Sequence, residues 1–171
     1  QYFTPRALIK TIVKCVNPEL GKVIVDPCCG SGGFLLAAKD FLQGKYTTMT
    51  GQQTDDLKLH TFYGTEIVPN TYRLCLMNLL LHGIGEFGGV PPIKCADSLA
   101  SAPSDNDLCE YVMTNPPFGK KSSTTIEVQE EDKETGEVVT KIKKAQDNYV
   151  RADFIATTSN KQLNFLQHIK S

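Results

Sequence analysis

Apolar residues follow two alternating patterns along the chain, one with helical spacing and one in short β-branched runs. Helical spacing begins over residues 5–16, where Thr4 can cap the helix and an Asn-Pro step ends it. The same spacing returns over 34–42, over 69–82 and from about Asn160 onward. These segments are predicted to be helices.

Runs rich in β-branched and aromatic residues separate the helices and are predicted to be strands. They lie at 22–26, 62–66, 92–95 and 111–114. Because strands alternate with helices, the fold class is α/β with a mostly parallel sheet and flanking helices, and ligand sites are expected beyond the carboxyl ends of the strands. A complete doubly wound domain usually has more strands, so we expect an incomplete fragment of the domain.

Two stretches lack a clear apolar period. The first, Gln43 to His60, is rich in Thr, Gln and Asp and is predicted to be an exposed loop. The second, at about 120–148, is strongly charged, and both a hairpin arm and a disordered segment are open interpretations. Residues 1–171 are therefore expected to form one partial domain with a charged loop or hairpin insertion.

The composition fits one globular core, since 40% of the 171 residues are hydrophobic and 22% are charged. No apolar run approaches the roughly 20 residues of a membrane span, and the start lacks a signal-peptide pattern, so a soluble protein is expected. The six cysteines and three histidines lack metal-ligand spacing, which predicts no metal site and reduced thiols in a cytoplasm. The net charge of -1 argues against a protein that holds nucleic acid unaided.

A glycine-rich turn follows the first predicted strand and leads into a helix. It reads Asp26-Pro27-Cys28-Cys29-Gly30-Ser31-Gly32-Gly33-Phe34, with glycines where a backbone passes close to a ligand and enters a helix N-terminus. That helix end would favour the carboxylate of an amino-acid-like group. A dinucleotide site is the alternative, although Leu35 stands where that pattern has glycine, and the phosphate-loop and hydrolase patterns are absent.

Acidic residues follow the second and third predicted strands. Glu66, with Ile67 next to it, could accept hydrogen bonds from both hydroxyls of a ribose. Asp97, with Ser98 beside it, could accept a hydrogen bond from the amino group of an adenine. For both carboxylates, a role as a solvated side chain at a strand end stays open.

The segment Asn115-Pro116-Pro117-Phe118 follows the fourth predicted strand and is the most specific motif. The Asn side chain and a carbonyl held by the proline pair offer two adjacent acceptors to a planar amino group, which would point its lone pair at a methyl donor. Phe118 could stack on a base that has been flipped out of a duplex. A plain turn leaving a strand is the alternative interpretation.

Together these motifs resemble the modification (M) subunit of type I restriction-modification systems, an N6-adenine DNA methyltransferase. The resemblance rests on Gln1-Tyr2-Phe3-Thr4-Pro5, Asp26 to Phe34, Asn115 to Gly119 and Thr158-Ser159-Asn160-Lys161-Gln162, and it covers almost the whole chain apart from the charged segment. It implies a Rossmann-like, S-adenosylmethionine-dependent methyltransferase fold, of which this chain would be a partial catalytic domain.

The resemblance also implies a cofactor, a substrate and partners. The cofactor would be S-adenosyl-L-methionine and the substrate an adenine in DNA, within a complex of two M subunits, a specificity (S) subunit and a restriction (R) subunit in a bacterial or archaeal cytoplasm. Phe3 and Thr4 would lie over the methionine end, the turn from Asp26 would cradle it, and Glu66 and Asp97 would bind the ribose and the adenine. The candidate cofactor-binding residues are Phe3, Thr4, Asp26, Pro27, Gly30, Ser31, Gly32, Glu66, Ile67, Asp97 and Ser98, and the candidate catalytic residues are Asn115, Pro116, Pro117 and Phe118.

Two other functions stay open at this point. Protein glutamine N-methyltransferases use Asn-Pro-Pro with an aromatic residue, generally Tyr, on another planar amide. A cofactor- or partner-binding module without activity of its own would also fit an incomplete domain.

Overall fold

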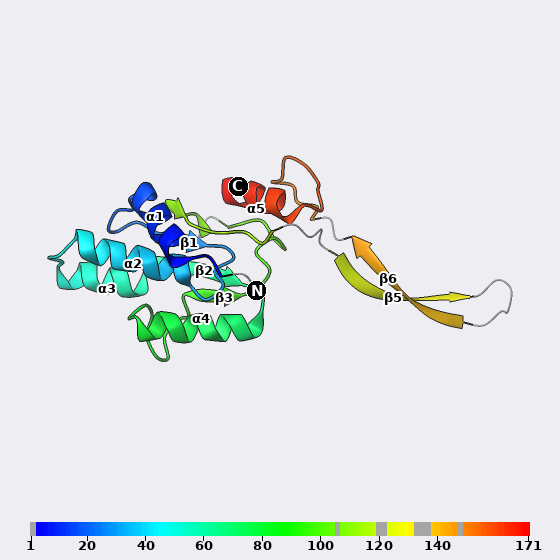
Figure 1. Cartoon of the computed structure of the whole chain (residues 1–171), viewed down its shortest axis with the longest axis horizontal. Coiled ribbons are helices and arrows are strands. Elements are labelled where there is room, and N and C mark those ends of the chain that lie inside the picture. Colours follow the sequence, from blue (N-terminus) through cyan, green and yellow to red (C-terminus); the bar gives the residue numbers. More distant parts are fainter. Residues whose placement is uncertain (1–2, 105–106, 119–122, 132–137, 147–148) are drawn as a thin grey trace. The chain divides into compact units, whose positions relative to one another are not determined.

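The computed structural model describes residues 3–104, 107–118, 123–131, 138–146 and 149–171 (Figure 1). It divides into two compact units, Gln1–Pro116 and Pro117–Ser171. Three parts of the predicted motifs lie outside the described residues, namely the Gln1-Tyr2 start, Gly119 and the centre of the charged segment at 132–137.

The first unit is built on a four-stranded parallel sheet. Its strands are β1 (Ile24–Asp26), β2 (Phe62–Glu66), β3 (Ile93–Cys95) and β4 (Tyr111–Val112), and they lie in the order β3-β2-β1-β4. Ile24 pairs with Phe62 on one side and with Tyr111 on the other. The four predicted strands and their parallel direction are confirmed.

Helices pack against this sheet in the first unit (Figure 1). They are α1 (Arg6–Val16), α2 (Gly33–Lys45), α3 (Gly51–Leu59) and α4 (Pro69–Leu81). The connections from β1 to β2 and from β2 to β3 advance in one direction across the sheet, so right-handed crossovers put α2, α3 and α4 on the same face. Ile9 and Val13 of α1 join Leu35 of α2, Leu79 of α4 and Ile24 of β1 in one buried core.

The segment from Gln43 to His60, predicted to be an exposed loop, is largely helical, so that prediction is wrong. α2 continues to Lys45, and α3 begins after Thr50. The Thr50 hydroxyl accepts from the Gln53 N–H, and the Gln53 side chain accepts from the Thr50 N–H, which is a capping box. Leu57 is the buried residue of this helix, and one apolar anchor produces no period in the sequence.

The strand order changes direction next to β1. After β1 the chain moves outward through β2 to β3, and it then returns to the opposite side of β1 to form β4. In open parallel sheets, such a switch point leaves a crevice beyond the carboxyl ends of the two strands. The turn that follows Asp26 and the segment that contains Asn115 therefore leave the sheet at the same crevice.

The second unit contains a hairpin and a helix. Strands β5 (Ser123–Glu131) and β6 (Val138–Gln146) pair antiparallel, and helix α5 spans Lys161–Lys170. The Asn160 side chain caps α5 by accepting from the N–H groups of Gln162 and Leu163, and the predicted helix here is confirmed. Within the described ranges, no helix is long and apolar enough to cross a membrane.

Candidate active site

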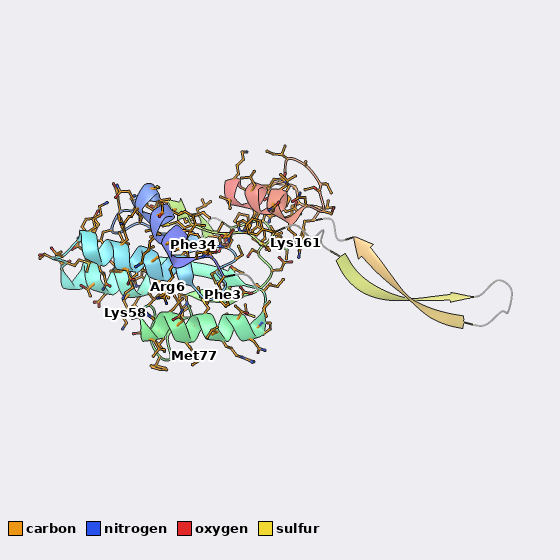
Figure 2. The ribbon with its side chains drawn as sticks, viewed as in Figure 1. Phe3, Arg6, Phe34, Lys58, Met77 and Lys161 are labelled. Carbon is orange, nitrogen blue, oxygen red and sulfur yellow. The ribbon has the colours of Figure 1, made fainter. Side chains whose placement is uncertain are left out.

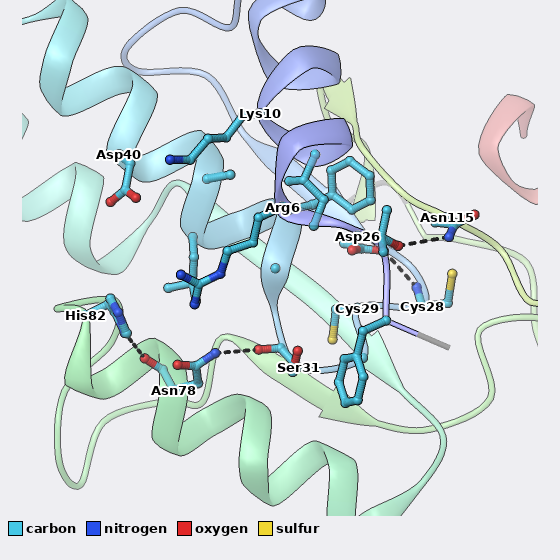
Figure 3. A pocket seen from close by; sticks show the side chains of 18 residues that line it. Arg6, Lys10, Asp26, Cys28, Cys29, Ser31, Asp40, Asn78, His82 and Asn115 are labelled. Carbon is cyan, nitrogen blue, oxygen red and sulfur yellow. Dashed lines mark hydrogen bonds between the residues drawn. The ribbon is translucent and has the colours of Figure 1, made fainter. Parts of the chain in front are cut away.

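A cavity of about 440 Å³ lies at the carboxyl end of β1 in the first unit (Figure 3). The segment before α1, the glycine-rich turn and the residue that follows Thr114 all contribute to its lining. Figure 2 labels three lining residues, Phe3, Arg6 and Phe34, near the start of α1 and α2. The predicted site residues in the lining are Phe3, Thr4, Asp26, Gly30, Ser31 and Asn115. The fold thus brings three distant motifs to one cavity.

The glycine-rich turn has backbone conformations that favour glycine. Gly30 has φ +55° and Gly32 has φ +83°. A Cβ atom on Gly32 would also lie 3.1 Å from both Cys75 Sγ and Leu79 Cδ2. Gly32 is the N-cap of α2 and makes no side-chain cap, so the first N–H groups of this helix are free of a side-chain acceptor and suit an anionic ligand.

Asp26 ends β1 beside this turn, and only 2% of its surface is exposed. Its Oδ1 accepts from the Cys28 N–H at 3.1 Å and from the Thr114 hydroxyl at 2.6 Å. Burial is the main reason that the pKa of Asp26 rises from 3.8 to about 7; the two hydrogen bonds oppose the rise, and the charge of Glu66 adds to it. Asp26 therefore changes charge near neutral pH, and a cation in the cavity would favour its ionised form.

Asn115 is connected to both of the other motifs. Thr114, the residue before it, donates to Asp26 and lies 2.9 Å from Cys28 Sγ. Asn115 Nδ2 donates to Thr4 Oγ1 over 2.9 Å. The prediction that Thr4 caps α1 is wrong, because Pro5 occupies the N-cap position and α1 has no side-chain cap.

Glu66 supports the glycine-rich turn from the end of β2. Its Oε2 accepts from the Gly30 N–H at 3.0 Å, and its Oε1 accepts from the Val68 N–H at 2.8 Å. The side chain is buried, with 7% of the residue exposed. Each carboxylate oxygen has a second lone pair, so a bond to a ribose stays a prediction. The bond to Gly30 adds a role in shaping the turn, which sequence reasoning missed.

The other predicted cofactor residues lie at the same edge of the sheet. Ser98 Oγ donates to the Pro27 carbonyl at 2.5 Å, which ties the segment after β3 to the turn. Asp97 Oδ1 accepts from the Leu99 N–H at 2.9 Å, and Ile67 is exposed. The contact of Asp97 with an adenine stays a prediction.

The predicted catalytic motif is divided between the two units. Asn115 and Pro116 are half-buried and end the first unit, whereas Pro117 and Phe118 begin the second unit and are exposed. The role of Phe118 in stacking on a base stays a prediction.

Comparison with known proteins identifies the family. The family described as N-6 DNA Methylase matches residues 1–171. This chain belongs to the N-6 DNA methylase family. It is 36% identical over 173 residues to the Type I restriction enzyme EcoKI methylase subunit of Escherichia coli K12, and 30% identical over 132 residues to the MjaIX methylase subunit of Methanocaldococcus jannaschii. These matches cover 99% and 77% of this chain but 28% and 21% of the relatives. The chain thus spans less than a third of their length.

Solved structures show the same fold. The crystal structure of the EcoKI M protein matches with a TM-score of 0.73 and 35% identity, covering 99% of this chain and 31% of that protein. A structure of a type I R-M system matches with a TM-score of 0.69 and 27% identity, covering 98% of this chain and 28% of the matched chain. The predicted Rossmann-like α/β methyltransferase fold is therefore confirmed.

Sequence reasoning missed several residues that line the cavity. Figure 3 shows Arg6 of α1 directed into the space near Asn78 of α4 and near His82, which follows α4. Asn78 Nδ2 donates to the Ser31 carbonyl at 2.9 Å, which anchors the turn on α4. Arg6 and Lys10 lie one helical turn apart on α1, and this spacing could have indicated a basic face beside the turn. Among the described residues, no group of three or more His, Cys, Asp or Glu could hold a metal ion.

Proposed function

We propose that this chain is the cofactor-binding and catalytic part of a type I modification subunit, which transfers a methyl group from S-adenosyl-L-methionine to N6 of an adenine flipped out of DNA. The observation that carries the proposal is the 2.6 Å hydrogen bond from Thr114 to Asp26, because it joins the residue before Asn115 to the glycine-rich turn. Asp26 and Asn115 line the same cavity. Membership of the N-6 DNA methylase family supports the same reaction and does not favour a glutamine amide as substrate.

The cavity fits the amino-acid end of S-adenosylmethionine. Gly32 packs closely against Cys75 and Leu79 of α4, which holds the turn in place, while Gly30, Ser31 and Gly33 line the cavity. The uncapped start of α2 favours a carboxylate there. Asp26 offers an anionic partner for an ammonium group, and Arg6 offers a cation for the carboxylate. When bound, this cofactor supplies an electrophilic methyl group.

The Asn-Pro-Pro-Phe segment would orient the adenine. Asn115 Oδ1 and the Pro116 carbonyl would each accept one hydrogen of the planar amino group, which turns the nitrogen lone pair toward the cofactor. Alignment by two acceptors would reduce the need for a strong base, because the acceptors would stabilise the positive charge that develops on the amino nitrogen as the methyl group leaves the sulfur, and the surplus proton could then pass to solvent. Phe118 would stack on the flipped base.

We also infer partners that hold and select the DNA. A net charge of -1 leaves little electrostatic attraction for DNA, which supports dependence on a separate specificity subunit. The relatives named above are methylase subunits of type I restriction enzymes. We therefore infer a complex with a second modification subunit, a specificity subunit and a restriction subunit, in the cytoplasm of a bacterium or archaeon.

The proposal is tested by transfer of labelled methyl groups from S-adenosylmethionine to unmethylated DNA. The enzyme that contains this chain is assayed with its specificity subunit, and the DNA is digested to nucleosides. We expect label in N6-methyladenine, and Asn115→Ala should reduce the rate by roughly 100-fold or more, as loss of an oriented polar contact in a transition state does. Asn70→Ala, at an exposed position of α4, should leave the rate unchanged.

Two results would overturn the proposal. Label in glutamine side chains of a protein would indicate an amide methyltransferase. Binding of the cofactor without any transfer, with all subunits present, would indicate a binding module.

A further inference from the structure

A hydrogen bond joins the segment before α1 to the predicted catalytic motif. Asn115 Nδ2 donates to Thr4 Oγ1 over 2.9 Å, and the two residues are 111 positions apart in the sequence. Both residues are half-buried and line the cavity. The Thr4 hydroxyl is not engaged in capping α1, so its contact with Asn115 has no role in starting that helix.

Both ends of this hydrogen bond are held in place by the core. Thr4 is followed by Pro5, whose carbonyl accepts from the Ile9 N–H at 3.1 Å as α1 begins. Ile9 is buried against the start of α2, where its Cδ1 would lie 3.1 Å from a Cβ on Gly33. The position of Thr4 therefore follows from the packing of α1 on α2.

The backbone before Asn115 is held by β1. The Met113 N–H donates to the Val25 carbonyl at 3.0 Å, and the Thr114 hydroxyl donates to Asp26 at 2.6 Å. The backbone that enters Asn115 is thus fixed to β1. The side chain of Asn115 can still rotate about its own torsions, and the hydrogen bond to the Thr4 hydroxyl restrains this rotation.

We propose that Thr4 is a positioning residue that sets the orientation of the Asn115 amide, so that Oδ1 rather than Nδ2 faces the amino group of the target base. This inference rests on the proposed function. An Asn side chain carries its donor and its acceptor on two branches of one planar group. When Thr4 binds the Nδ2 branch, the Oδ1 branch is left to accept from the substrate.

The orientation matters because the substrate group is itself a donor. An amide turned by a half rotation would present its own N–H groups to the adenine amino group, and two donors cannot form a hydrogen bond. Thr4 then acts on the reaction through Asn115, whereas the family resemblance assigned it to the methionine end of the cofactor. The two roles differ in whether loss of the hydroxyl changes the methyl-transfer step or cofactor affinity.

The test compares Thr4→Val, which keeps the shape and removes the hydroxyl, with Thr4→Ser, which keeps the hydroxyl. Each variant is made in the enzyme that contains this chain, with its specificity subunit. Single-turnover methylation of DNA and the Kd for S-adenosylmethionine are both measured. We expect Thr4→Val to slow methyl transfer roughly tenfold, about 1.4 kcal/mol of activation free energy, with the Kd unchanged within about twofold. Thr4→Ser should restore most of the rate.

Thr4→Ala serves as a second variant without the hydroxyl, and thermal unfolding checks that each variant is folded. Because Ala and Ser at this position differ by one hydroxyl group, their rates give the same comparison if Thr4→Val does not fold. A weaker Kd with an unchanged transfer rate would overturn the inference and assign Thr4 to the cofactor. Equal rates for wild type, Thr4→Val and Thr4→Ala would overturn it as well. If wild type itself methylates no adenine, the proposed function fails instead.

Discussion

The most specific prediction concerns the charge of Asp26. Its pKa of about 7 means that roughly a tenth of the side chain is ionised at pH 6 and roughly nine tenths at pH 8. S-adenosylmethionine carries a sulfonium and an ammonium group, and the ionised carboxylate should bind it more tightly. We therefore expect affinity to rise about tenfold between pH 6 and pH 8, which is about 1.4 kcal/mol.

Asp26→Asn isolates this effect. The amide keeps an Oδ1 that can accept from the Cys28 N–H and the Thr114 hydroxyl, so the turn should stay in place while the charge is lost. Isothermal titration calorimetry should then show weaker binding at pH 8 and little change between pH 6 and pH 8. The cofactor's own ammonium group begins to lose its charge toward pH 8, which weakens its attraction to Asp26, so about tenfold is the upper limit of the rise in wild type.

A matched control is available in the same cavity. Asp40 also lines it but is exposed on α2, so Asp40→Asn should keep the tenfold dependence on pH. The reasoning is refuted if Asp26→Asn shows the same dependence on pH as wild type, or if wild type shows none.

Two further predictions concern packing and the basic face of α1. Gly64→Ala would bring a Cβ to 2.8 Å from the Asp26 backbone oxygen and should lower the free energy of unfolding, measured in urea, by about 1–3 kcal/mol. Gly44→Ala in helix α2, where a Cβ would meet nothing within 4 Å, should raise the free energy of unfolding by up to about 1 kcal/mol. Equal effects of the two would contradict this packing. Arg6→Met should lower the affinity for S-adenosylmethionine about tenfold but leave the affinity for 5′-methylthioadenosine, which lacks the carboxylate, unchanged. Lys14→Met, at an exposed position of the same helix, should change neither affinity. An equal loss of affinity for both ligands would show that Arg6 does not bind the carboxylate.

The parts of the fold that could be predicted are those with local sequence signals. Strands β1, β2 and β4 are rich in β-branched or aromatic residues. The residues singled out after β1 and β4 meet because parallel strands end at one edge. The glycine-rich turn could be predicted because Gly30 and Gly32 adopt positive φ values that other residues avoid. Helix α3 was missed because it is held by the Thr50 capping box rather than by an apolar stripe.

The parts that could not be predicted depend on contacts between distant residues. A Thr before a Pro is a local signal for a helix cap, but the partner of Thr4 is Asn115, and nothing in the local sequence indicates it. Glu66 was expected to bind a ribose. Its hydrogen bonds to the Gly30 and Val68 N–H groups follow instead from the register of β2 beside β1. Burial of Asp26, which raises its pKa, likewise depends on the whole sheet.

The assignment of the cavity as the methyl-transfer site is tested most directly by a crystal structure of the enzyme with S-adenosylhomocysteine, the product that remains after methyl transfer. We predict that the amino-acid end of this ligand lies against the start of α2 beside Asp26, with its sulfur facing Asn115. A ligand bound outside this cavity, or one whose sulfur faces away from Asn115, would contradict the assignment of the cavity as the methyl-transfer site.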